Sequence, residues 1–134
     1  MVSHKWQGKY EETGKGISKV YKAAGRYSAG SPINLYFDGE YREIANIESC
    51  LPINKEITTN LDCKTLAGGK FVSYIHIGPY DKIGESYEKV FGYINEHKLT
   101  TELPTREVYL KGPGMIFKGS PEKYMTEILV KVTE

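Results

Sequence analysis

An acidic residue and a phenol stand two positions apart in the segment PTREVYLKG, residues 104–112. The branched and aromatic residues of this segment are typical of a strand. Side chains of a strand alternate between faces, so Glu107 and Tyr109 share one face while Val108 and Leu110 share the other. An aromatic ring and a desolvated carboxylate both attract soft cations. The same pair could act as general base and proton donor on a reactive substrate.

A second copy of this pattern lies in the first half of the chain. The segment NLYFDG, which begins at Asn34, aligns with EVYLKG of the later segment. Asn34 and Tyr36 take the places of the acid and of its neighbouring phenol. If a pseudo-two-fold axis relates the two copies, all four polar side chains project from one side of a common sheet. The acid would then stand among aromatic rings.

Helical and closing segments repeat in the same order. YEETGKGISKVY begins at Tyr10 and YDKIGESYEKVF begins at Tyr80. Both place apolar residues three and four positions apart, which is typical of an amphipathic helix. ESCLPI, residues 48–53, aligns with EILVKV, residues 127–132, once an insertion is allowed in the loop at 113–123. Each half is therefore predicted to contain a helix, a strand, a hairpin and a strand.

The second half has a further segment, KTLAGGKFVSYIHIGPY, before its helix, in which the turn AGG predicts two strands. The corresponding segment of the first half, MVSHKWQ, begins at the first residue and shares only Val2 and Ser3 with it. The sequence therefore predicts a truncated first strand. An unpaired strand edge at this place favours association, for example into a homodimer.

These repeats predict one α+β domain over residues 1–134, with module one at 1–56 and module two at 57–134. The sheet is expected to be mainly antiparallel, with both helices on one face and a ligand cleft on the other. The expected helix-facing residues are Leu35, Phe37, Val108 and Leu110. The expected cleft side carries the polar residues of the two repeated strands, Asn34, Tyr36, Glu107 and Tyr109.

Two interpretations of Glu107 are open. A glutamate on the uncovered face of an antiparallel sheet is commonly a solvated residue paired with a lysine. In the alternative, Tyr36 and Tyr109 stack on a flat or cationic molecule in a shallow apolar cleft, and Glu107 neutralises its charge. The first interpretation predicts an exposed carboxylate, and the second predicts a desolvated one.

Trp6 and His76 occupy matching positions ahead of the two helical segments. Trp6 either closes one end of the cleft by stacking on a ligand or packs before the first helix. His76 alternates with Ile75 and Ile77, so it shares a face with Tyr74. If that face is the uncovered one, His76 is a further candidate for ligand binding.

The overall composition excludes several classes of function. The 134 residues carry 18 basic and 17 acidic side chains, so no net field attracts the chain to nucleic acid. No segment approaches the roughly 20 apolar residues of a membrane span, and the N-terminus has no apolar signal sequence. Neither the cysteines, Cys50 and Cys63, nor the histidines have metal-ligand spacing. We expect no metal, no cofactor and a cytoplasmic location with reduced thiols.

Three segments follow one another in an order known from one family: HIGPYDKIGESYEKVFGYI, PTREVYLKGPG and YMTEILVKV. The sequence resembles the GyrI-like small-molecule-binding domain. That domain occurs alone and as the effector-binding domain of bacterial multidrug-sensing activators of the MerR and AraC types. The resemblance is close over residues 60–134 and extends to NLYFDGEY and the strand that ends at Ile53. The fold is also similar to that of the SOUL haem-binding family, where His76 would be an axial ligand, although it lacks a partner motif.

The resemblance implies that the protein binds lipophilic, often cationic, aromatic compounds, with Glu107 as the acidic centre of the cleft. It implies a binding domain more than an enzyme. Some standalone relatives resemble hydrolases of cyclopropane-bearing toxins, for which Glu107 would be the general base and Tyr109 the proton donor. A protein interaction like that of a topoisomerase inhibitor is a further alternative. The chain has no helix-turn-helix motif, so a role in transcription would require a separate DNA-binding partner.

Overall fold

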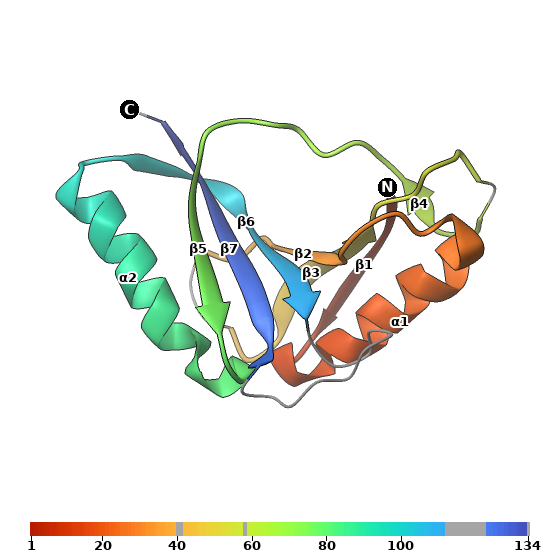
Figure 1. The fold of residues 1–134 in the computed structure, drawn as a ribbon, viewed down its shortest axis with the longest axis horizontal. Helices are drawn as coiled ribbons and strands as arrows, with labels where there is room; N and C mark the ends of the chain where they lie inside the picture. Colours follow the sequence, from red (N-terminus) through yellow and green to blue (C-terminus); the bar gives the residue numbers. More distant parts are fainter. Residues whose placement is uncertain (40–41, 58, 112–122, 134) are drawn as a thin grey trace. The chain divides into compact units, whose positions relative to one another are not determined.

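The chain folds into two compact units, Met1–Ala67 and Gly68–Glu134. Figure 1 traces the elements along the chain. The computed structural model describes residues 1–39, 42–57, 59–111 and 123–133. The units divide after Ala67, whereas the repeat placed the boundary after residue 56. The reason is strand β4 (Asp62–Cys63), which pairs with the first strand of the chain and so belongs to the first unit.

Within its described residues, the first unit packs one α-helix against four antiparallel strands. Its elements are β1 (Val2–Gly8), a 3-10 turn (Tyr10–Glu12), α1 (Thr13–Ala24), a second 3-10 turn (Gly25–Tyr27), β2 (Ile33–Tyr36), β3 (Ala45–Leu51) and β4. The strands lie in the order β4-β1-β3-β2. β1 pairs with β3 over its whole length, from Val2 opposite Leu51 to Gly8 opposite Ala45.

The second unit packs one α-helix against three antiparallel strands, again within its described residues. Its elements are β5 (Phe71–Ile77), a 3-10 turn (Tyr80–Lys82), α2 (Ile83–Glu96), β6 (Thr100–Lys111) and β7 (Met125–Thr133). The strands lie in the order β6-β7-β5. β7 is therefore the central strand of this unit and contacts both neighbours through backbone hydrogen bonds.

The two units repeat one order of elements: strand, 3-10 turn, helix, strand, strand. The predicted helices and the antiparallel strand pair that follows each helix are confirmed. The 3-10 turns begin at Tyr10 and Tyr80, the two tyrosines that align in sequence. The prediction of a truncated first strand is wrong, because β1 and β5 each have seven residues. The residues before Lys9 suffice for a full strand that pairs with all of β3.

The prediction of a hairpin around the turn AGG is also wrong. Residues 64–70 form no strand, and β5 pairs with β7 instead of with a preceding strand. The chain before this segment is held by the N-terminus: the Lys64 amide donates to the Met1 carbonyl at 2.8 Å, and the Met1 ammonium donates to the Lys64 carbonyl at 2.6 Å. The loop expected at 113–123 lies outside the described residues except for Lys123.

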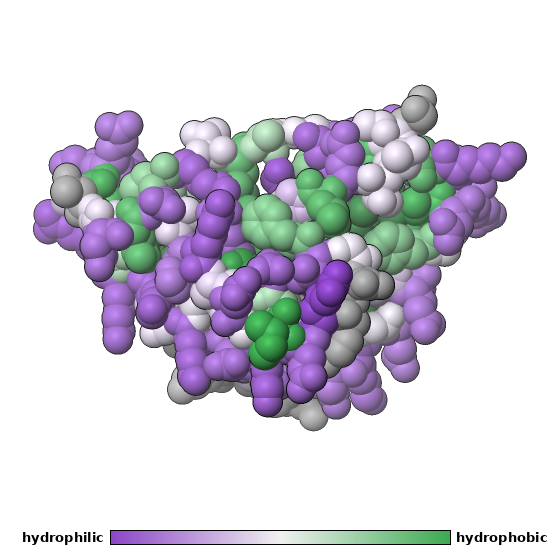
Figure 2. Space-filling model, turned by 180° about the vertical axis from the view of Figure 1, so that it is seen from behind, coloured by the Kyte–Doolittle hydropathy of each residue, from purple (hydrophilic) through white to green (hydrophobic). Residues whose placement is uncertain are grey.

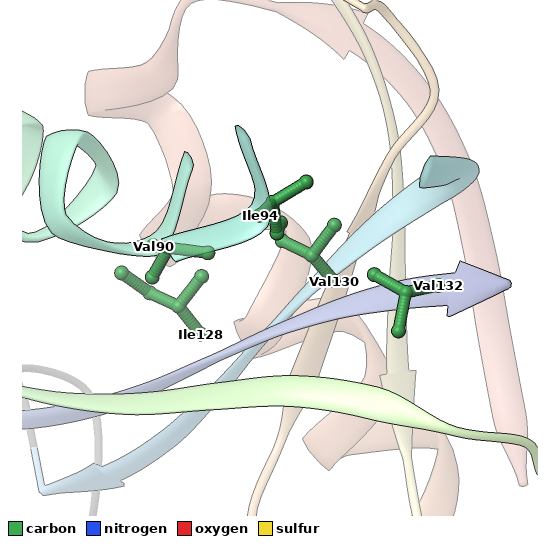
Figure 3. Packing of buried hydrophobic residues seen from close by; sticks show 5 residues of the cluster. All are labelled: Val90, Ile94, Ile128, Val130 and Val132. Atoms are coloured by element: carbon green, nitrogen blue, oxygen red, sulfur yellow. The ribbon is translucent and has the colours of Figure 1, made fainter. Parts of the chain in front are cut away.

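The core of the second unit lies between α2 and β7. Apolar residues of α2 recur at helical spacing, so that they form one stripe on the side of the helix that meets the strand. The buried residues of this cluster are Val90, Ile94, Ile128, Val130 and Val132. Figure 3 shows that the two helix residues point towards the side chains of β7. The alternate residues of β7 thereby identify which face of the strands α2 covers.

The core of the first unit is built in the same way. Val20 and Ala24 of α1 are buried against Val2 of β1 and Leu51 of β3. One turn closer to the start of α1, Gly16 is buried against Trp6. A Cβ atom at position 16 would lie 2.5 Å from Trp6 Nε1 and 2.6 Å from Ser49 Oγ, so the helix approaches the strands here as closely as glycine allows.

Replacing Gly16 by alanine should destabilise the protein, although alanine is the better helix former. The added Cβ forces Trp6 or the helix to shift, and overpacking of this kind costs about 1–3 kcal/mol. Gly14 of the same helix is the matched control, since a Cβ atom there meets nothing within 4 Å. Gly14→Ala should be stabilising by up to about 1 kcal/mol. Urea denaturation followed by tryptophan fluorescence measures both; equal effects of the two substitutions would contradict this account of the packing.

Hydrophobic side chains reach the surface in separate groups between hydrophilic ones on the face shown in Figure 2. The large hydrophobic residues exposed in the described structure are Phe37, Ile44, Ile75, Ile77, Phe91, Tyr93 and Leu103. No helix in the described ranges combines the length and the apolar character needed to cross a bilayer.

Candidate functional site

Glu107 and Tyr109 lie on the face of β6 that α2 covers. Glu107 is paired across the ladder with Ile128, and Tyr109 with Thr126. Directly opposed residues of neighbouring strands share a face, and Ile128 packs against α2. The Tyr87 hydroxyl, on α2, also donates to the Glu107 carboxylate. The expectation that these two residues face away from the helices is therefore wrong.

The same correction holds in the first unit. Asn34 lies opposite Ser49 on the ladder, and Tyr36 lies opposite Ile47. The Asn34 amide donates to the Thr13 hydroxyl, the first residue of α1, at 3.4 Å. Asn34 and Tyr36 thus face α1, in the same sense as their counterparts face α2.

Strand alternation fixed which residues share a face but not which face the helix covers. Val108 and Leu110 were expected to face the helix because they are apolar, and this expectation is wrong. They are half-buried on the other side of β6, whereas Glu107 and Tyr109 are buried. A helix can cover a polar pair without a large cost when its own side chains hydrogen-bond that pair, as Tyr87 does.

Glu107 is 9% exposed, and its carboxylate accepts hydrogen bonds on both oxygens. The Tyr87 hydroxyl donates to Oε2, and the Tyr109 hydroxyl donates to Oε1 at 2.9 Å. These contacts rule out the interpretation of Glu107 as a solvated surface acid. A buried carboxylate that is hydrogen-bonded by phenols keeps its position while remaining in a poorly hydrated environment.

Two further tyrosines complete an aromatic cluster around this acid. The Tyr80 ring lies 5.8 Å from the Tyr109 ring, nearly edge-on, and 5.5 Å from the Tyr124 ring. Burial, with the neighbouring Tyr124 and Glu107 groups, raises the pKa of Tyr80 to about 12. The Tyr80 phenol therefore stays neutral at any physiological pH, and Glu107 is the acidic group of the cluster.

The raised pKa of Tyr80 predicts a loss of stability in alkali. The folded protein holds the Tyr80 proton more tightly than the unfolded chain does, because tyrosines of the unfolded chain titrate near pH 10. The stabilisation that comes from this difference is therefore complete below about pH 10. It is lost as the pH rises through about 12. The urea midpoint should fall between these values, and it should fall less in Tyr80→Phe. Tyr93→Phe is the control, since this ring is exposed; an equal change in both variants would refute the assignment to Tyr80.

His76 lies beside this cluster and is 5% exposed. Its Nε2 lies 2.9 Å from the Pro79 carbonyl oxygen, and its Nδ1 lies 2.7 Å from Ser86 Oγ. Because a carbonyl only accepts, Nε2 carries the proton; in the neutral ring Nδ1 then accepts from the Ser86 hydroxyl. Both ring nitrogens are thus engaged with the protein, which favours a positioning role over direct ligand contact or haem ligation.

The equivalent region of the first unit is a neutral hydrogen-bond network. Asn34 is 0% exposed; its Oδ1 accepts from the Ser49 hydroxyl at 2.6 Å, and its Nδ2 donates to the Tyr36 hydroxyl at 3.1 Å. Trp6 Nε1 donates to Ser49 Oγ at 3.0 Å, and the ring lies against α1 at Gly16. Trp6 therefore belongs to the packing beneath α1, the second of the two roles that its position predicted.

The two units are thus similar in geometry but differ in the chemistry of their side chains. Tyr10 and Tyr36 form a ring pair at 5.9 Å in the first unit, as Tyr80 and Tyr109 do in the second. Among the residues that the structure describes, only the second unit has a carboxylate at the position between the strand and its helix. The buried acid of the first unit, Glu48, lies on the other face, where Lys64 Nζ neutralises it at 2.7 Å.

A comparison with sequence profiles of protein families decides the affiliation. The profile of the GyrI-like small molecule binding domain matches residues 1–133. The chain belongs to the GyrI-like family. The resemblance inferred from the three sequence segments is thereby confirmed. No curated protein sequence matches the chain significantly.

Two solved structures of EcmrR share the GyrI-like fold of this chain. A cryo-EM structure of an EcmrR–DNA complex matches with a TM-score of 0.84 at 24% identity, covering 98% of this chain and 53% of that chain. The crystal structure of the EcmrR C-terminal domain matches with a TM-score of 0.82 at 23% identity, covering 99% and 90%. This chain therefore spans about half the length of EcmrR in the DNA complex.

A crystal structure of a hydrolase from Listeria innocua has the same fold at greater distance. It matches with a TM-score of 0.67 at 14% identity, covering 98% of this chain and 86% of that chain. At such identities the likeness concerns the fold and leaves the chemistry of each GyrI-like protein to its own residues.

Sequence reasoning missed three members of the site in this GyrI-like domain: Tyr80, Tyr87 and Ser86. Tyr87 has the helical spacing of the apolar stripe of its segment, and Tyr80 marks only where the two repeats align. The signal that could have found the two tyrosines is the tyrosine content of the chain, 11 tyrosines against 4 phenylalanines. A hydroxyl on the buried side of an amphipathic helix needs a polar partner, and Glu107 on the facing strand is such a partner.

The described residues contain no group of three or more histidine, cysteine or acidic side chains that could hold a metal ion. Cys50 is buried and Cys63 is exposed, and both are free thiols. The chemistry of the candidate site is that of one carboxylate and several phenols.

Proposed function

We propose that this GyrI-like domain binds lipophilic cations, with Glu107 as the residue that neutralises the ligand's charge. The observation that carries the proposal is the burial of the Glu107 carboxylate within a cluster of tyrosines, where Tyr87 and Tyr109 hold it by hydrogen bonds. A carboxylate in such surroundings favours a cation that brings few water molecules with it. Lipophilic, aromatic cations have that property, whereas small hydrated ions do not.

The aromatic rings supply the second part of the recognition. Tyr80 and Tyr124 extend the ring cluster from Tyr109, and the raised pKa of Tyr80 keeps its phenol neutral at neutral pH. Neutral phenols offer their faces to a cation and their hydroxyls to polar groups of the ligand. In this proposal His76, held by Pro79 and Ser86, supports the residues that touch the ligand.

A pair of compounds with and without charge tests the proposal. Tetraphenylphosphonium and triphenylphosphine oxide present similar phenyl surfaces, but only the first is a cation. Isothermal titration calorimetry should show binding of tetraphenylphosphonium at least about tenfold tighter, corresponding to about 1.4 kcal/mol. Equal affinity for both compounds, or no binding of either, would overturn the proposed function.

The role of such binding is proposed to be detection or sequestration of the compound in the cytoplasm. The family name describes small-molecule binding, and EcmrR combines the same fold with binding to DNA. We propose that any action of this domain on transcription requires a DNA-binding unit, either in the same protein or in a partner.

A second candidate function is hydrolysis of a strained electrophile such as a cyclopropane-bearing toxin. It is favoured by the direct hydrogen bond from the Tyr109 hydroxyl to Glu107, which places a carboxylate base and a phenol acid in one site. In such a reaction Glu107 would take a proton from water, the water oxygen would attack the ring carbon, and Tyr109 would protonate the carbon that leaves. Incubation with an electrophilic cyclopropane distinguishes the candidates. A hydrolase yields the ring-opened, hydrated product, whereas a binding domain returns the compound unchanged.

A further inference from the structure

The turn before α2 is held at three consecutive residues. The Gly78 amide donates to the Tyr124 carbonyl at 2.9 Å, and the Pro79 carbonyl accepts from His76 Nε2 at 2.9 Å. Tyr80 follows directly, with its ring between those of Tyr109 and Tyr124. Gly78 has a φ of +127°, which other residues rarely adopt, so the turn has a backbone path that must be maintained by its contacts.

His76 connects this turn to two other elements. It lies on β5 opposite Thr126 of β7, and its Nδ1 contacts Ser86 on α2. The ring therefore bridges a strand, the turn and the helix with both nitrogens, and Ser86 is itself buried. A histidine held in this way fixes the Pro79 carbonyl relative to β5 and α2.

The first unit has the same turn without this connection. Trp6 takes the place of His76, and Gly16 takes the place of Ser86. Trp6 donates to Ser49 on β3, and the 3-10 turn at Tyr10 is preceded by Lys9 instead of a proline. The histidine–serine pair therefore occurs only in the unit that contains Glu107, which links it to the acid site and not to the fold that both units share.

We propose that His76 and Ser86 are positioning residues that hold the turn at Pro79 so that Tyr80 stands against Tyr109 beside Glu107. This proposal rests on the proposed function in that the positioned ring forms part of the cation site. Tyr80 is adjacent in sequence to the carbonyl that His76 holds. We call the hydrogen bonds of His76 with Pro79 and Ser86 the clasp. Loosening the clasp should release the Tyr80 ring before it affects Glu107, which lies on β6. Ligand affinity and the surroundings of the Tyr80 phenol should change together.

The variants His76→Gln and Ser86→Ala test the proposal, with His97→Gln as control because His97 is exposed and its ring contacts Tyr93 of the preceding helix. Tyrosine labelled with ¹³C at the ζ carbon reports each phenol by NMR, and Tyr80→Phe assigns the Tyr80 signal. In the wild type this signal should titrate near pH 12. In both clasp variants its midpoint should move towards 10, the ordinary value for an exposed phenol. The control should leave it unchanged.

Affinity for tetraphenylphosphonium supplies the second measurement. Both clasp variants should weaken it roughly tenfold through lost preorganisation of the ring. Near-UV circular dichroism verifies that each variant is folded, and Ser86→Ala keeps the test available if His76→Gln does not fold. A folded variant in which the Tyr80 midpoint stays near 12 overturns the positioning role. If the wild type does not bind the cation, the proposed function fails, while the Tyr80 titration still decides whether the clasp positions this ring.

Discussion

Replacing Glu107 by glutamine should weaken the binding of tetraphenylphosphonium by about 1–3 kcal/mol, or roughly 5- to 150-fold in Kd. Glutamine preserves the shape of the side chain and one oxygen that can accept from Tyr87 or Tyr109, but it removes the negative charge. The substitution should therefore weaken the binding of the cation and leave the binding of a neutral compound nearly unchanged. Binding of triphenylphosphine oxide should change by less than about twofold, because this compound has no charge to neutralise.

Glu102→Gln is the matched control for this substitution. Glu102 lies on the same strand, but its side chain is half-exposed, near Lys131. A charge at that position is screened by water and should affect cation affinity by no more than about 0.5 kcal/mol. If Glu107→Gln and Glu102→Gln weakened the binding of the cation equally, the general charge of the protein would explain the effect. Equal losses for the charged and the neutral compound would show that the carboxylate's charge has no role.

Replacing Ile128 by alanine should produce the largest loss of stability, about 2–5 kcal/mol in the free energy of unfolding. Ile128 is fully buried between β7 and α2, in the cluster with Val90 and Ile94. It is also the residue directly opposite Glu107 on the ladder, so a cavity here loosens the helix that supplies Tyr87. Urea denaturation followed by circular dichroism measures the loss.

Ile77→Ala is the comparison for this prediction. Ile77 is 65% exposed on β5, so truncating it leaves no cavity and should change the free energy of unfolding by no more than about 0.5 kcal/mol. A loss as small in Ile128→Ala would mean that α2 does not pack on β7 as described. A folded Ile128→Ala variant should also bind tetraphenylphosphonium more weakly than the wild type, since Tyr87 is then less firmly placed.

The repeat, both helices and the strand pair after each helix follow from the sequence alone. Helical spacing of apolar residues and strand alternation are local consequences of backbone geometry, so they can be read without knowing what the elements contact. The alignment of Tyr10 with Tyr80 predicted the start of both helical segments, where the structure has 3-10 turns that lead into α1 and α2. Alternation also established that Glu107 and Tyr109 share a face, which the ladder with β7 confirms.

Which of the two faces of β6 carries Glu107 and Tyr109 depends on tertiary contacts. Alternation has two equivalent solutions, and the choice between them depends on what packs above the strand; here the Tyr87 hydroxyl of α2 makes the polar face of β6 the covered one. The full length of β1 and the pairing of β4 likewise depend on partners distant in sequence. The roles of Trp6 and His76 differ for the same reason. The two residues occupy equivalent positions in the repeat, but Trp6 packs against a glycine of α1, whereas His76 hydrogen-bonds a serine of α2.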